Sequence, residues 1–324
     1  MNTLITGGAG FIGSHLAQEL LERGQEVHLI DDFSTGHKAN IAHILSNPRL
    51  RLVEGSVLDP ECMEPLIAGC SEIYHLAAAV GVRLVIDKPV ETIMTNVRGT
   101  DVVLELARKW SRKVLVASTS EIYGKNSSGP LREEDDRIMG SVTKHRWAYA
   151  NTKTLDEFLA LAYHRQYGLP TIIVRLFNTV GPRQTGRYGM VIPNFVRAAL
   201  AGEPIQVYGS GRQTRCFACV SDVVRGLADL MAHPGAVGEV FNIGNNAEVS
   251  IEELAHRVRA LAGSSSPICH VPYEEAYGPG FEDMERRVPD LAKIRALIGY
   301  APRTGLDEIL RSVIEYFRAN PRAS

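Results

Sequence analysis

The sequence lacks an excess of charge of either sign. It carries 35 Lys and Arg residues against 37 Asp and Glu residues, so the formal net charge is −2 over 324 residues. Nucleic acids and anionic membranes are bound through clustered positive charge, so neither is an expected partner. Hydrophobic residues make up 45% and charged residues 22%, which is the composition of a globular protein and excludes intrinsic disorder.

Cysteine is scarce and odd in number. The five residues are Cys62, Cys70, Cys216, Cys219 and Cys269. This count excludes a disulfide framework and fits a reducing compartment. Cys216 and Cys219 have C-x-x-C spacing, but no second pair stands at zinc spacing and the pair is not expected to open a helix, as a redox pair would. We therefore expect two cysteines on a buried extended segment and no metal site.

No hydrophobic run is long enough to cross a membrane. The longest runs, such as residues 75–82, fall well short of the roughly 20 apolar residues that a span requires. The first apolar run, residues 3–6, leads directly into glycines and leaves no room for a signal peptide. We therefore expect a soluble, cytoplasmic protein.

Short β-branched runs alternate with helical patterns in the first half of the chain. This alternation predicts an α/β fold of Rossmann type, in which a doubly wound parallel sheet binds ligands at the carboxyl ends of its strands. After residue 178 Gly and Pro become frequent and the runs shorten. We expect a dinucleotide-binding domain over 1–177, to which parts of 216–245 return, and a smaller interleaved α/β substrate-binding lobe over 178–324. The expected strands are 3–6, 26–31, 50–54, 72–76, 113–117 and 171–175, and the expected helices include 14–23 and 96–110.

A further helix is predicted over residues 149–165. Leu155, Phe158, Leu159 and Ala162 follow the i, i+3, i+4, i+7 spacing of an amphipathic helix. This spacing predicts that the four side chains form the buried face.

A glycine-rich turn follows the first predicted strand. Gly7, Gly10 and Gly13 have G-x-x-G-x-x-G spacing and precede a helical pattern. Such glycines let the backbone approach a pyrophosphate, which binds at the helix N-terminus. Asp31 ends the second predicted strand, where a carboxylate accepts hydrogen bonds from an adenosine ribose and repels a 2′-phosphate. The pattern predicts a dinucleotide site that favours NAD over NADP, and a turn without a ligand is the alternative.

Two short patterns carry candidate chemistry. Tyr149 and Lys153 are four residues apart, so both side chains lie on one face of a helix. A neighbouring ammonium favours phenolate, and we expect Tyr149 to be the base that deprotonates a sugar hydroxyl while a hydride leaves the same carbon. We expect Thr119 and Ser120 to hydrogen-bond that hydroxyl or the phenol, and Glu121 to be a second acid or base. The alternatives are a half-buried tyrosine beside a surface lysine, and a strand end that caps the following turn.

In this order, the glycine-rich turn, the Ser-Thr-Ser-Glu run and Tyr-x-x-x-Lys resemble the extended short-chain dehydrogenase/reductases. The resemblance covers essentially the whole chain and includes His-Leu-Ala-Ala at 75–78, Asn-Val-Arg-Gly-Thr at 96–100 and Arg-Leu-Phe-Asn-Thr-Val-Gly-Pro-Arg at 175–183. Within that family the chain is similar to the NAD-dependent nucleotide-sugar epimerases, dehydratases and decarboxylases. The resemblance implies that a hydride passes from C4 of the sugar to bound NAD while Tyr149 takes the hydroxyl proton. Lys153 would also hold the nicotinamide ribose.

The resemblance also implies a set of binding residues. We expect cofactor contacts from Gly7, Gly10, Phe11, Ile12, Gly13, Asp31, Asp32, Ser34, Thr35, Gly36, Ser56, Val57, Leu76, Ala77, Ala78, Asn96, Ser118, Tyr149 and Lys153. Ser56 stands where the family often has an aspartate that contacts adenine. We expect substrate contacts from Asn178, Arg187, Val191, Gln206, Tyr208, Arg215 and Arg287. Among these, Asn178 and the arginines at 215 and 287 are assigned to the diphosphate, since guanidinium pairs bidentately with phosphate, and Gln206 and Tyr208 to the base.

Different parts of the sequence favour different fates of the 4-keto sugar. Thr-Ser-Glu at 119–121 resembles the UDP-glucuronate decarboxylases, and Ser120 replaces the aspartate of a 4,6-dehydratase. Residues 147–150 and 187–193 resemble the epimerases instead. Thr185 stands where epimerases of UDP-glucuronate often have a carboxylate-binding arginine, and Arg187 is its candidate substitute.

We expect a UDP-sugar 4-epimerase that acts on UDP-glucuronate and UDP-galacturonate or on UDP-glucose and UDP-galactose. A UDP-glucuronate decarboxylase that forms UDP-xylose is the first alternative, and a 4,6-dehydratase is the second. An NAD-binding regulatory protein without catalysis is the alternative of a different class. The family often dimerises through the helices predicted at 96–110 and 149–165, so the resemblance implies a homodimer.

Overall fold

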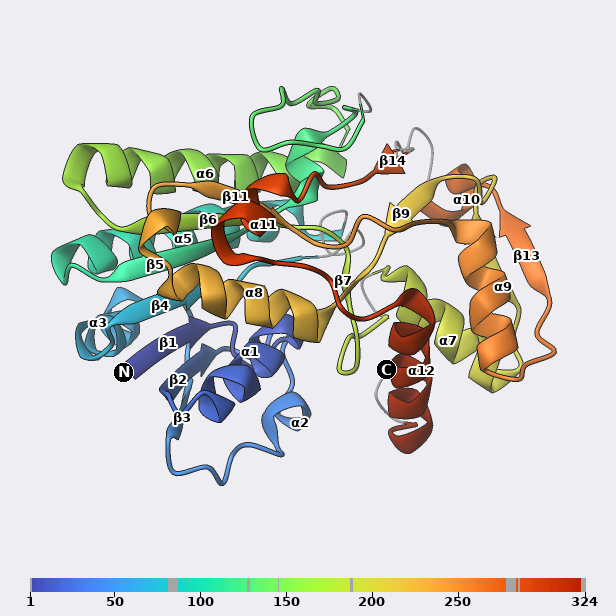
Figure 1. Cartoon of the computed structure of the whole chain (residues 1–324), viewed down its shortest axis with the longest axis horizontal. Helices are drawn as coiled ribbons and strands as arrows, with labels where there is room; N and C mark the ends of the chain where they lie inside the picture. The colour runs from blue at the N-terminus through green and yellow to red at the C-terminus, as the bar shows by residue number, and fades with distance from the viewer. Residues whose placement is uncertain are drawn as a thin grey trace.

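A seven-stranded parallel sheet forms the centre of the computed structural model, which describes residues 2–80, 87–126, 129–144, 146–186, 189–277, 284 and 286–321. Its strand order is β11-β6-β5-β4-β1-β2-β3, which runs from top to bottom at the left of Figure 1. The strands are β1 (Asn2–Thr6), β2 (Glu26–Asp31), β3 (Leu50–Glu54), β4 (Glu72–His75), β5 (Lys113–Thr119), β6 (Thr171–Leu176) and β11 (Val240–Ile243). The strand order reverses between β1 and β4, and the α/β fold of Rossmann type is confirmed.

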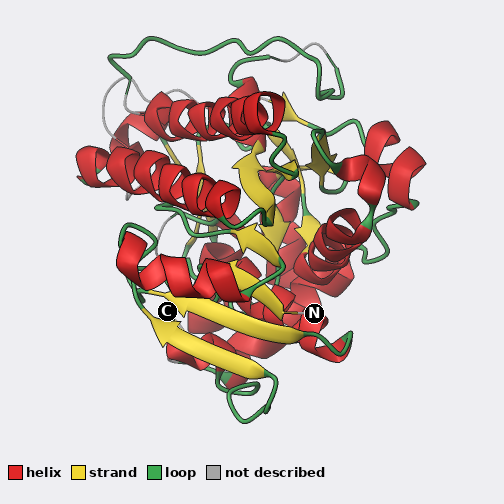
Figure 2. Ribbon diagram, turned by 90° about the vertical axis from the view of Figure 1, so that its left-hand side faces the viewer, coloured by secondary structure: helices red, strands yellow, loops and turns green. Residues whose placement is uncertain are grey.

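Helices cover both faces of the sheet (Figure 2). Side chains alternate along each strand, so that Leu4 of β1 packs into one layer and Ile5 into the other. Each layer is a continuous apolar core. On one face lie α1 (Phe11–Glu22), α8 (Val220–Ala232) and α11 (Ala292–Ile298), and on the other lie α3 (Pro60–Gly69), α5 (Pro89–Lys109) and α6 (Arg146–Tyr167).

The apolar face predicted for α6 is not buried against the sheet. Leu155 is 44% exposed and Phe158 is 59% exposed, and Ala162 is also exposed. The inward face carries polar residues instead, among them the fully buried Asp156. Leu159 packs partly against the core, but the prediction was wrong for the other three side chains. The amphipathic spacing identifies an apolar face without saying whether the same chain or a partner covers it.

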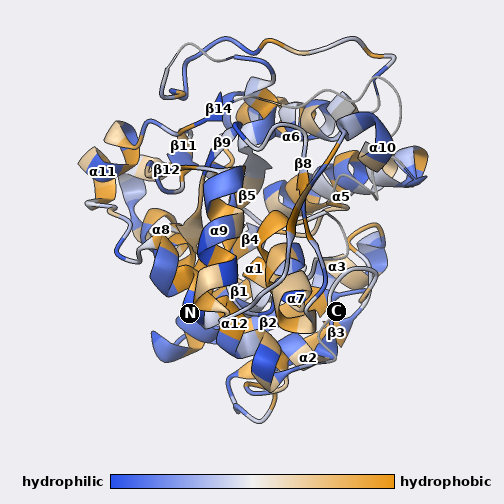
Figure 3. Cartoon of the chain, turned by 90° about the vertical axis from the view of Figure 1, so that its right-hand side faces the viewer, coloured by the Kyte–Doolittle hydropathy of each residue, from blue (hydrophilic) through white to orange (hydrophobic). Residues whose placement is uncertain are grey.

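The remaining elements pack around an apolar core of their own, and we refer to them as the second lobe. Figure 3 views the molecule from the side of α7, α9 and α12, whose inner faces form this core. Its small sheets have the orders β10-β7, β12-β9-β14 and β13-β8. The strands are β7 (Thr179–Val180), β8 (Ile205–Tyr208), β9 (Thr214–Cys216), β10 (Ala218–Cys219), β12 (Glu248–Ser250), β13 (Ile268–Val271) and β14 (Arg286–Arg287). The helices are α7 (Val191–Ala201), α9 (Ile251–Leu261), α10 (Tyr273–Tyr277) and α12 (Leu306–Ala319).

The two lobes are interleaved along the chain. The segment that follows β10 returns to the central sheet, where α8 covers one face and β11 pairs in parallel with β6. Two short helical turns, η1 (Ser120–Tyr123) and η2 (Pro234–Ala236), and the four-residue α2 (Lys38–Ile41) complete the described elements. None of the helices in the described part of the chain combines the length and apolar character needed to cross a membrane.

The C-x-x-C pair joins β9 to β10 in the second lobe. Both cysteines are buried at the ends of strands, as the sequence predicts, and α8 begins directly after the pair, with Cys219 as its N-cap residue. Burial raises the pKa of the Cys216 thiol to about 12. This thiol therefore stays protonated and lacks the thiolate needed for redox chemistry.

Candidate active site

The glycine-rich turn connects β1 to α1 at the switch point of the sheet. Gly7 has a φ of +68°, and its amide donates to the Ile30 carbonyl at 2.9 Å. A Cβ atom on Gly13 would lie 2.2 Å from the Gly7 carbonyl oxygen, so only glycine fits where the helix meets the turn. Gly10 is the N-cap residue, followed by Phe11 and Ile12 in the first turn of α1. This cradle fits a pyrophosphate at the helix N-terminus.

Asp31, at the end of β2, holds the glycine-rich turn. Its two carboxylate oxygens accept hydrogen bonds from the amides of Ala9 at 2.9 Å and Phe33 at 2.8 Å. Burial raises the pKa of Asp31, and these two amide hydrogen bonds oppose the rise. A carboxylate oxygen can accept more than one hydrogen bond, so the ribose role predicted for Asp31 is compatible with its second role of anchoring the turn.

The other predicted cofactor residues lie at the same edge of the sheet. The segment 32–36 follows β2, and a Cβ atom on Gly36 would lie 2.7 Å from Asp31 Oδ1. Residues 56 and 57 follow β3, while 76–78 follow β4 beside β1. Asn96 of α5 accepts a hydrogen bond from the Ala79 amide at 2.8 Å, which fixes the segment after β4.

Tyr149 and Lys153 lie on the inward face of α6. Tyr149 is 9% exposed and Lys153 is 2% exposed, so the alternative of a surface lysine is wrong. Thr152 links this helix to α5, since its hydroxyl accepts a hydrogen bond from Asn96 at 3.3 Å. The same hydroxyl donates within α6 to the Tyr149 carbonyl at 2.8 Å. The Lys153 ammonium pairs with Asp156 at 2.9 Å.

A buried ionic network supports the same helix from the sheet side. Arg175 of β6 forms a bidentate pair with Glu157 of α6, with a shortest N–O distance of 2.8 Å. Glu157 also accepts from the Ser118 hydroxyl, and Arg175 donates to Tyr123 at 2.8 Å. The sequence analysis did not identify this network. The available signal was that Glu157 lies four residues after Lys153, on the same helical face.

The hydroxyl-rich run lies at the carboxyl end of β5. Thr119 Oγ1 accepts the amide of Glu121 at 3.2 Å and caps η1, which agrees with the turn-capping alternative. Ser120 is 1% exposed. The carboxylate of Glu121 lies 3.6 Å from the guanidinium of Arg287, and Arg287 donates to Asn178 Oδ1 at 3.1 Å. The tertiary structure therefore joins the strand end to β14 of the second lobe.

Arg215 and Arg287 are register neighbours on the parallel strands β9 and β14, and both are buried. Two adjacent guanidinium groups favour an anion beside them. Gln206 is exposed on β8, where Tyr208 donates to it at 3.4 Å. Val191 begins α7, whereas Arg187 lies outside the described residues.

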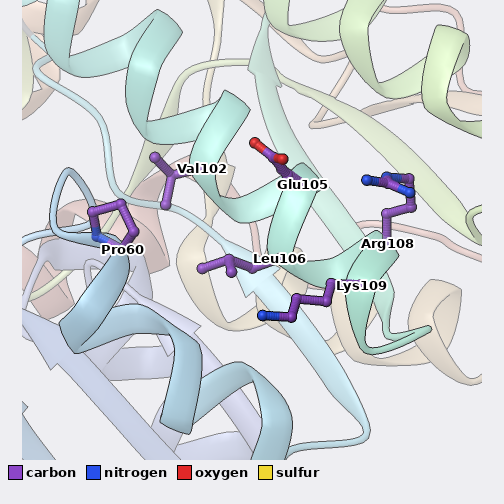
Figure 4. A pocket seen from close by; sticks show the side chains of 6 residues that line it. All are labelled: Pro60, Val102, Glu105, Leu106, Arg108 and Lys109. Atoms are coloured by element: carbon purple, nitrogen blue, oxygen red, sulfur yellow. The ribbon is translucent and has the colours of Figure 1, made fainter.

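One surface cavity lies between α3 and α5 (Figure 4). Its cations are engaged elsewhere, since Lys109 pairs with Glu64 at 2.5 Å and Arg108 stacks on the Tyr167 ring at 5.0 Å. None of its lining residues is among the predicted site residues or their hydrogen-bond partners described in the preceding paragraphs, so the cavity is not part of the candidate active site. The lining residues are Pro60, Val102, Glu105, Leu106, Arg108 and Lys109.

Comparisons with known proteins identify the family of the chain. The family model for GDP-mannose 4,6 dehydratase matches residues 4–313. The chain is 45% identical over 317 residues to the UDP-N-acetyl-alpha-D-glucosaminuronate decarboxylase of Bacillus cytotoxicus, covering 97% of each chain. It is 39% identical over 317 residues to UDP-glucuronic acid decarboxylase 1 of Xenopus tropicalis, covering 97% of this chain and 72% of the relative.

A solved structure of similar fold is a variant of the UDP-glucuronic acid 4-epimerase of Bacillus cereus, in complex with UDP-4-deoxy-4-fluoro-glucuronic acid and NAD. It matches with a TM-score of 0.89 and 29% identity over 98% of this chain and 99% of that one. The matched family model spans most of the chain, and both decarboxylases exceed 30% identity over nearly all of it. The chain therefore belongs to the extended short-chain dehydrogenase/reductase family, among its NAD-dependent nucleotide-sugar epimerases, dehydratases and decarboxylases.

Proposed function

We propose that the protein is a decarboxylase of a UDP-linked hexuronic acid, with NAD as its cofactor. The observation that carries the proposal is the contact between Glu121 and Arg287 at 3.6 Å, beside Thr119 at the end of β5. A cation and an acid next to the hydroxyl-rich run suit a sugar with a carboxylate at C6. This assigns Arg287 to the sugar, whereas the sequence analysis assigned it to the diphosphate.

The comparisons favour decarboxylation over the 4-epimerisation that the sequence analysis expected. The relatives at 45% and 39% identity are both named as decarboxylases. Thr185 agrees with them for a physical reason. Arg287 shares its charge with Glu121, so it would hold the C6 carboxylate only weakly. A dedicated arginine at position 185 would further stabilise the negative charge that decarboxylation removes, so an uncharged threonine there leaves the barrier to loss of CO₂ lower.

The reaction follows from the arrangement of the side chains. NAD held at the glycine-rich turn and by Asp31 and Lys153 would supply the hydride acceptor for C4 and the donor for its later reduction. Tyr149 removes the proton from the C4 hydroxyl, and the Lys153 ammonium favours its phenolate form. In the resulting β-keto acid the C5–C6 bond breaks, its electron pair passes into the C4 carbonyl as an enolate, and CO₂ leaves.

The enolate then needs hydrogen-bond donors and a proton. The hydroxyl of Thr119 and the protonated phenol of Tyr149 can donate to the C4 oxygen, where the negative charge develops. The proton that C5 gains comes from solvent water, because the C4 hydroxyl proton stays on Tyr149 until C4 is reduced again. We assign its transfer to C5 to Glu121, which then returns to its carboxylate form. The product is a UDP-linked pentose, or its 2-acetamido counterpart when the substrate carries an acetamido group at C2.

The test is to incubate the purified protein separately with UDP-glucuronate and UDP-N-acetylglucosaminuronate, each labelled with ¹³C at C6. We expect labelled CO₂ and a UDP-sugar without C6 from at least one substrate, observed by NMR. A C4 epimer that keeps its label would support the 4-epimerase instead. The Tyr149→Phe variant is the matched control and should release no CO₂ above background.

We also propose that two copies of the chain pair through α5 and α6. The exposed Leu155 and Phe158 of α6 give this surface an apolar character, as do Val90, Ile93 and Met94 of α5, of which Val90 is 73% exposed. A second copy that covers these side chains would remove apolar surface from water. Sedimentation velocity should give a dimer, and Phe158→Glu should shift it to the monomer; a monomeric parent protein would contradict the proposal.

A further inference from the structure

A second charged residue accompanies the Tyr-x-x-x-Lys pair on α6. Tyr149, Lys153 and Asp156 are spaced by four and then three residues, so they lie on one helical face over two turns. Lys153 Nζ lies 2.9 Å from Asp156 Oδ2, and the two side chains are 3% and 0% exposed. A buried pair of this kind is strongly coupled, because little water screens the two charges.

Among the described residues, the groups of β4 and β5 that face this pair include no competing acid. His75 of β4 bonds to the hydroxyls of Thr6 at 2.9 Å and Thr100 at 3.1 Å. Burial, and then the charge of Lys153, lower the pKa of His75 to about 3, so its ring is neutral. From β5, the Ser118 and Thr119 hydroxyls are uncharged.

Other charged groups also lie around α6. Asp101 and Glu105 of α5 act on Tyr163, ten residues after Lys153. Arg175 of β6 is bound to Glu157, and Glu121 of η1 lies against Arg287. From α5, the side chain recorded in hydrogen-bond contact with α6 is the uncharged Asn96. Among the described residues, Asp156 is therefore the carboxylate that balances the charge of Lys153.

The other oxygen of Asp156 points to a role beyond stability. Asp156 Oδ1 is buried and accepts no hydrogen bond from the described residues. A buried carboxylate that is only half satisfied destabilises a fold relative to an apolar residue of similar size. Stability alone would thus not favour an aspartate here, and Lys153 is its single partner within the part of the chain that the structure describes.

We propose that Asp156 is a positioning residue, which keeps Lys153 protonated and directs its ammonium group toward Tyr149 and the nicotinamide ribose. An ammonium group has three N–H donors and no acceptor. Asp156 takes one donor and leaves two for the phenol oxygen and a ribose hydroxyl. The inference rests on the proposed roles of Tyr149 and Lys153, but it does not depend on whether the 4-keto sugar loses CO₂.

Removal of the carboxylate would leave a buried ammonium without a counter-charge. Burial disfavours the charged form of lysine, so the proton would be lost at a lower pH than in the parent protein. A neutral Lys153 would neither favour the Tyr149 phenolate nor attract the ribose as strongly. The loss of activity and of NAD affinity should therefore increase as the pH rises and disappear as the pH falls.

The test compares Asp156→Asn with the parent protein. Asparagine keeps the shape and one hydrogen-bond acceptor but removes the charge. We expect the alkaline limb of the kcat profile to move to lower pH by about one unit or more, since buried lysines shift by up to several units. The dissociation constant for NAD, measured by titration calorimetry on cofactor-free protein, should rise about tenfold across the same pH range, in parallel with the limb.

Glu239→Gln is the matched control. It removes the acid from an ion pair of similar length, Lys293–Glu239 at 2.8 Å, whose side chains are 30% and 51% exposed. Its pH profile and NAD affinity should match those of the parent. An Asp156→Asn variant with an unmoved alkaline limb, or with an equal loss of activity at every pH, would overturn the proposal. An inactive parent protein or an active Tyr149→Phe variant would instead contradict the proposed function.

A crystal structure of the parent protein with NAD provides a second test if the variant does not fold. We expect Lys153 Nζ to stay within hydrogen-bond distance of Asp156 while it contacts the ribose. A lysine that leaves Asp156 when the cofactor binds would overturn the proposal.

Discussion

The buried pair between Arg175 and Glu157 permits a prediction about stability with a defined magnitude. The two side chains are 9% and 8% exposed, and the guanidinium makes a bidentate contact with the carboxylate. It also donates to the Tyr123 hydroxyl and to the Glu133 carbonyl, both at 2.8 Å. Arg175→Met keeps the length of the side chain but leaves the Glu157 charge buried beside an apolar group.

Loss of one partner from a buried ion pair costs about 3–5 kcal/mol, because the remaining charge stays desolvated. We expect Arg175→Met to lower the free energy of unfolding by this amount. The double variant Arg175→Met/Glu157→Leu removes both charges and should recover a large part of the loss, because well-packed apolar residues often replace a buried pair at little cost.

Urea unfolding of the cofactor-free protein, followed by circular dichroism, gives the measurement. A stability change appears as a lower midpoint with an unchanged slope. Arg257→Met is the control, because Arg257 pairs with Asp307 at the surface with exposures of 43% and 50%. Such pairs contribute at most about 1 kcal/mol. A loss below about 1 kcal/mol for Arg175→Met, or a double variant less stable than the single, would refute the reasoning.

The other predictions concern pH, the cofactor and catalysis. The pKa of His75 is about 3 in the folded protein against an ordinary value of 6.5, so its contribution to stability is present above pH 6.5 and is lost as the pH falls toward 3. The melting temperature should fall over this range, and His75→Gln should flatten the decline; an equally steep decline would contradict the assignment. Gly13→Ala brings a Cβ atom within 2.2 Å of the Gly7 carbonyl and should abolish the retention of NAD during purification, whereas Gly69→Ala, which meets no atom within 4 Å, should not. Tyr149→Phe should lower kcat by about 100-fold or more while NAD still binds, and a loss below threefold would remove this residue from the role of base.

Much of the central sheet follows from local patterns. The bounds of β2 and β3 agree with the predicted runs at 26–31 and 50–54 because parallel strands are short, rich in β-branched and apolar residues, and bordered by turns. The glycine-rich turn is equally local. Gly7 adopts a positive φ and Gly13 leaves no room for a side chain, so the spacing of these glycines reports their geometry directly. The boundary between the two lobes, which we place at residue 177, stays a prediction.

The amphipathic spacing of α6 shows what local sequence patterns cannot predict, namely which face of a helix the rest of the fold covers. The sequence shows that Leu155 and Phe158 share a face, but only the packed structure shows that this face is outward. Asp156 reads as an ordinary surface acid in the sequence. Its burial follows from the rotation of the helix about its axis, which is set by the sheet and by α5 together.

The sequence by itself determined the sheet, the glycine-rich turn and the Tyr149–Lys153 pair, because each depends on residues that are close along the chain. Only the tertiary structure decided that Arg287 meets Glu121 and that Asp156 balances Lys153. The first contact joins η1, which follows β5, to β14 of the second lobe, and the second depends on which side of α6 is buried. Periodicity along the chain carries neither piece of information, because both arise from how the elements pack in space.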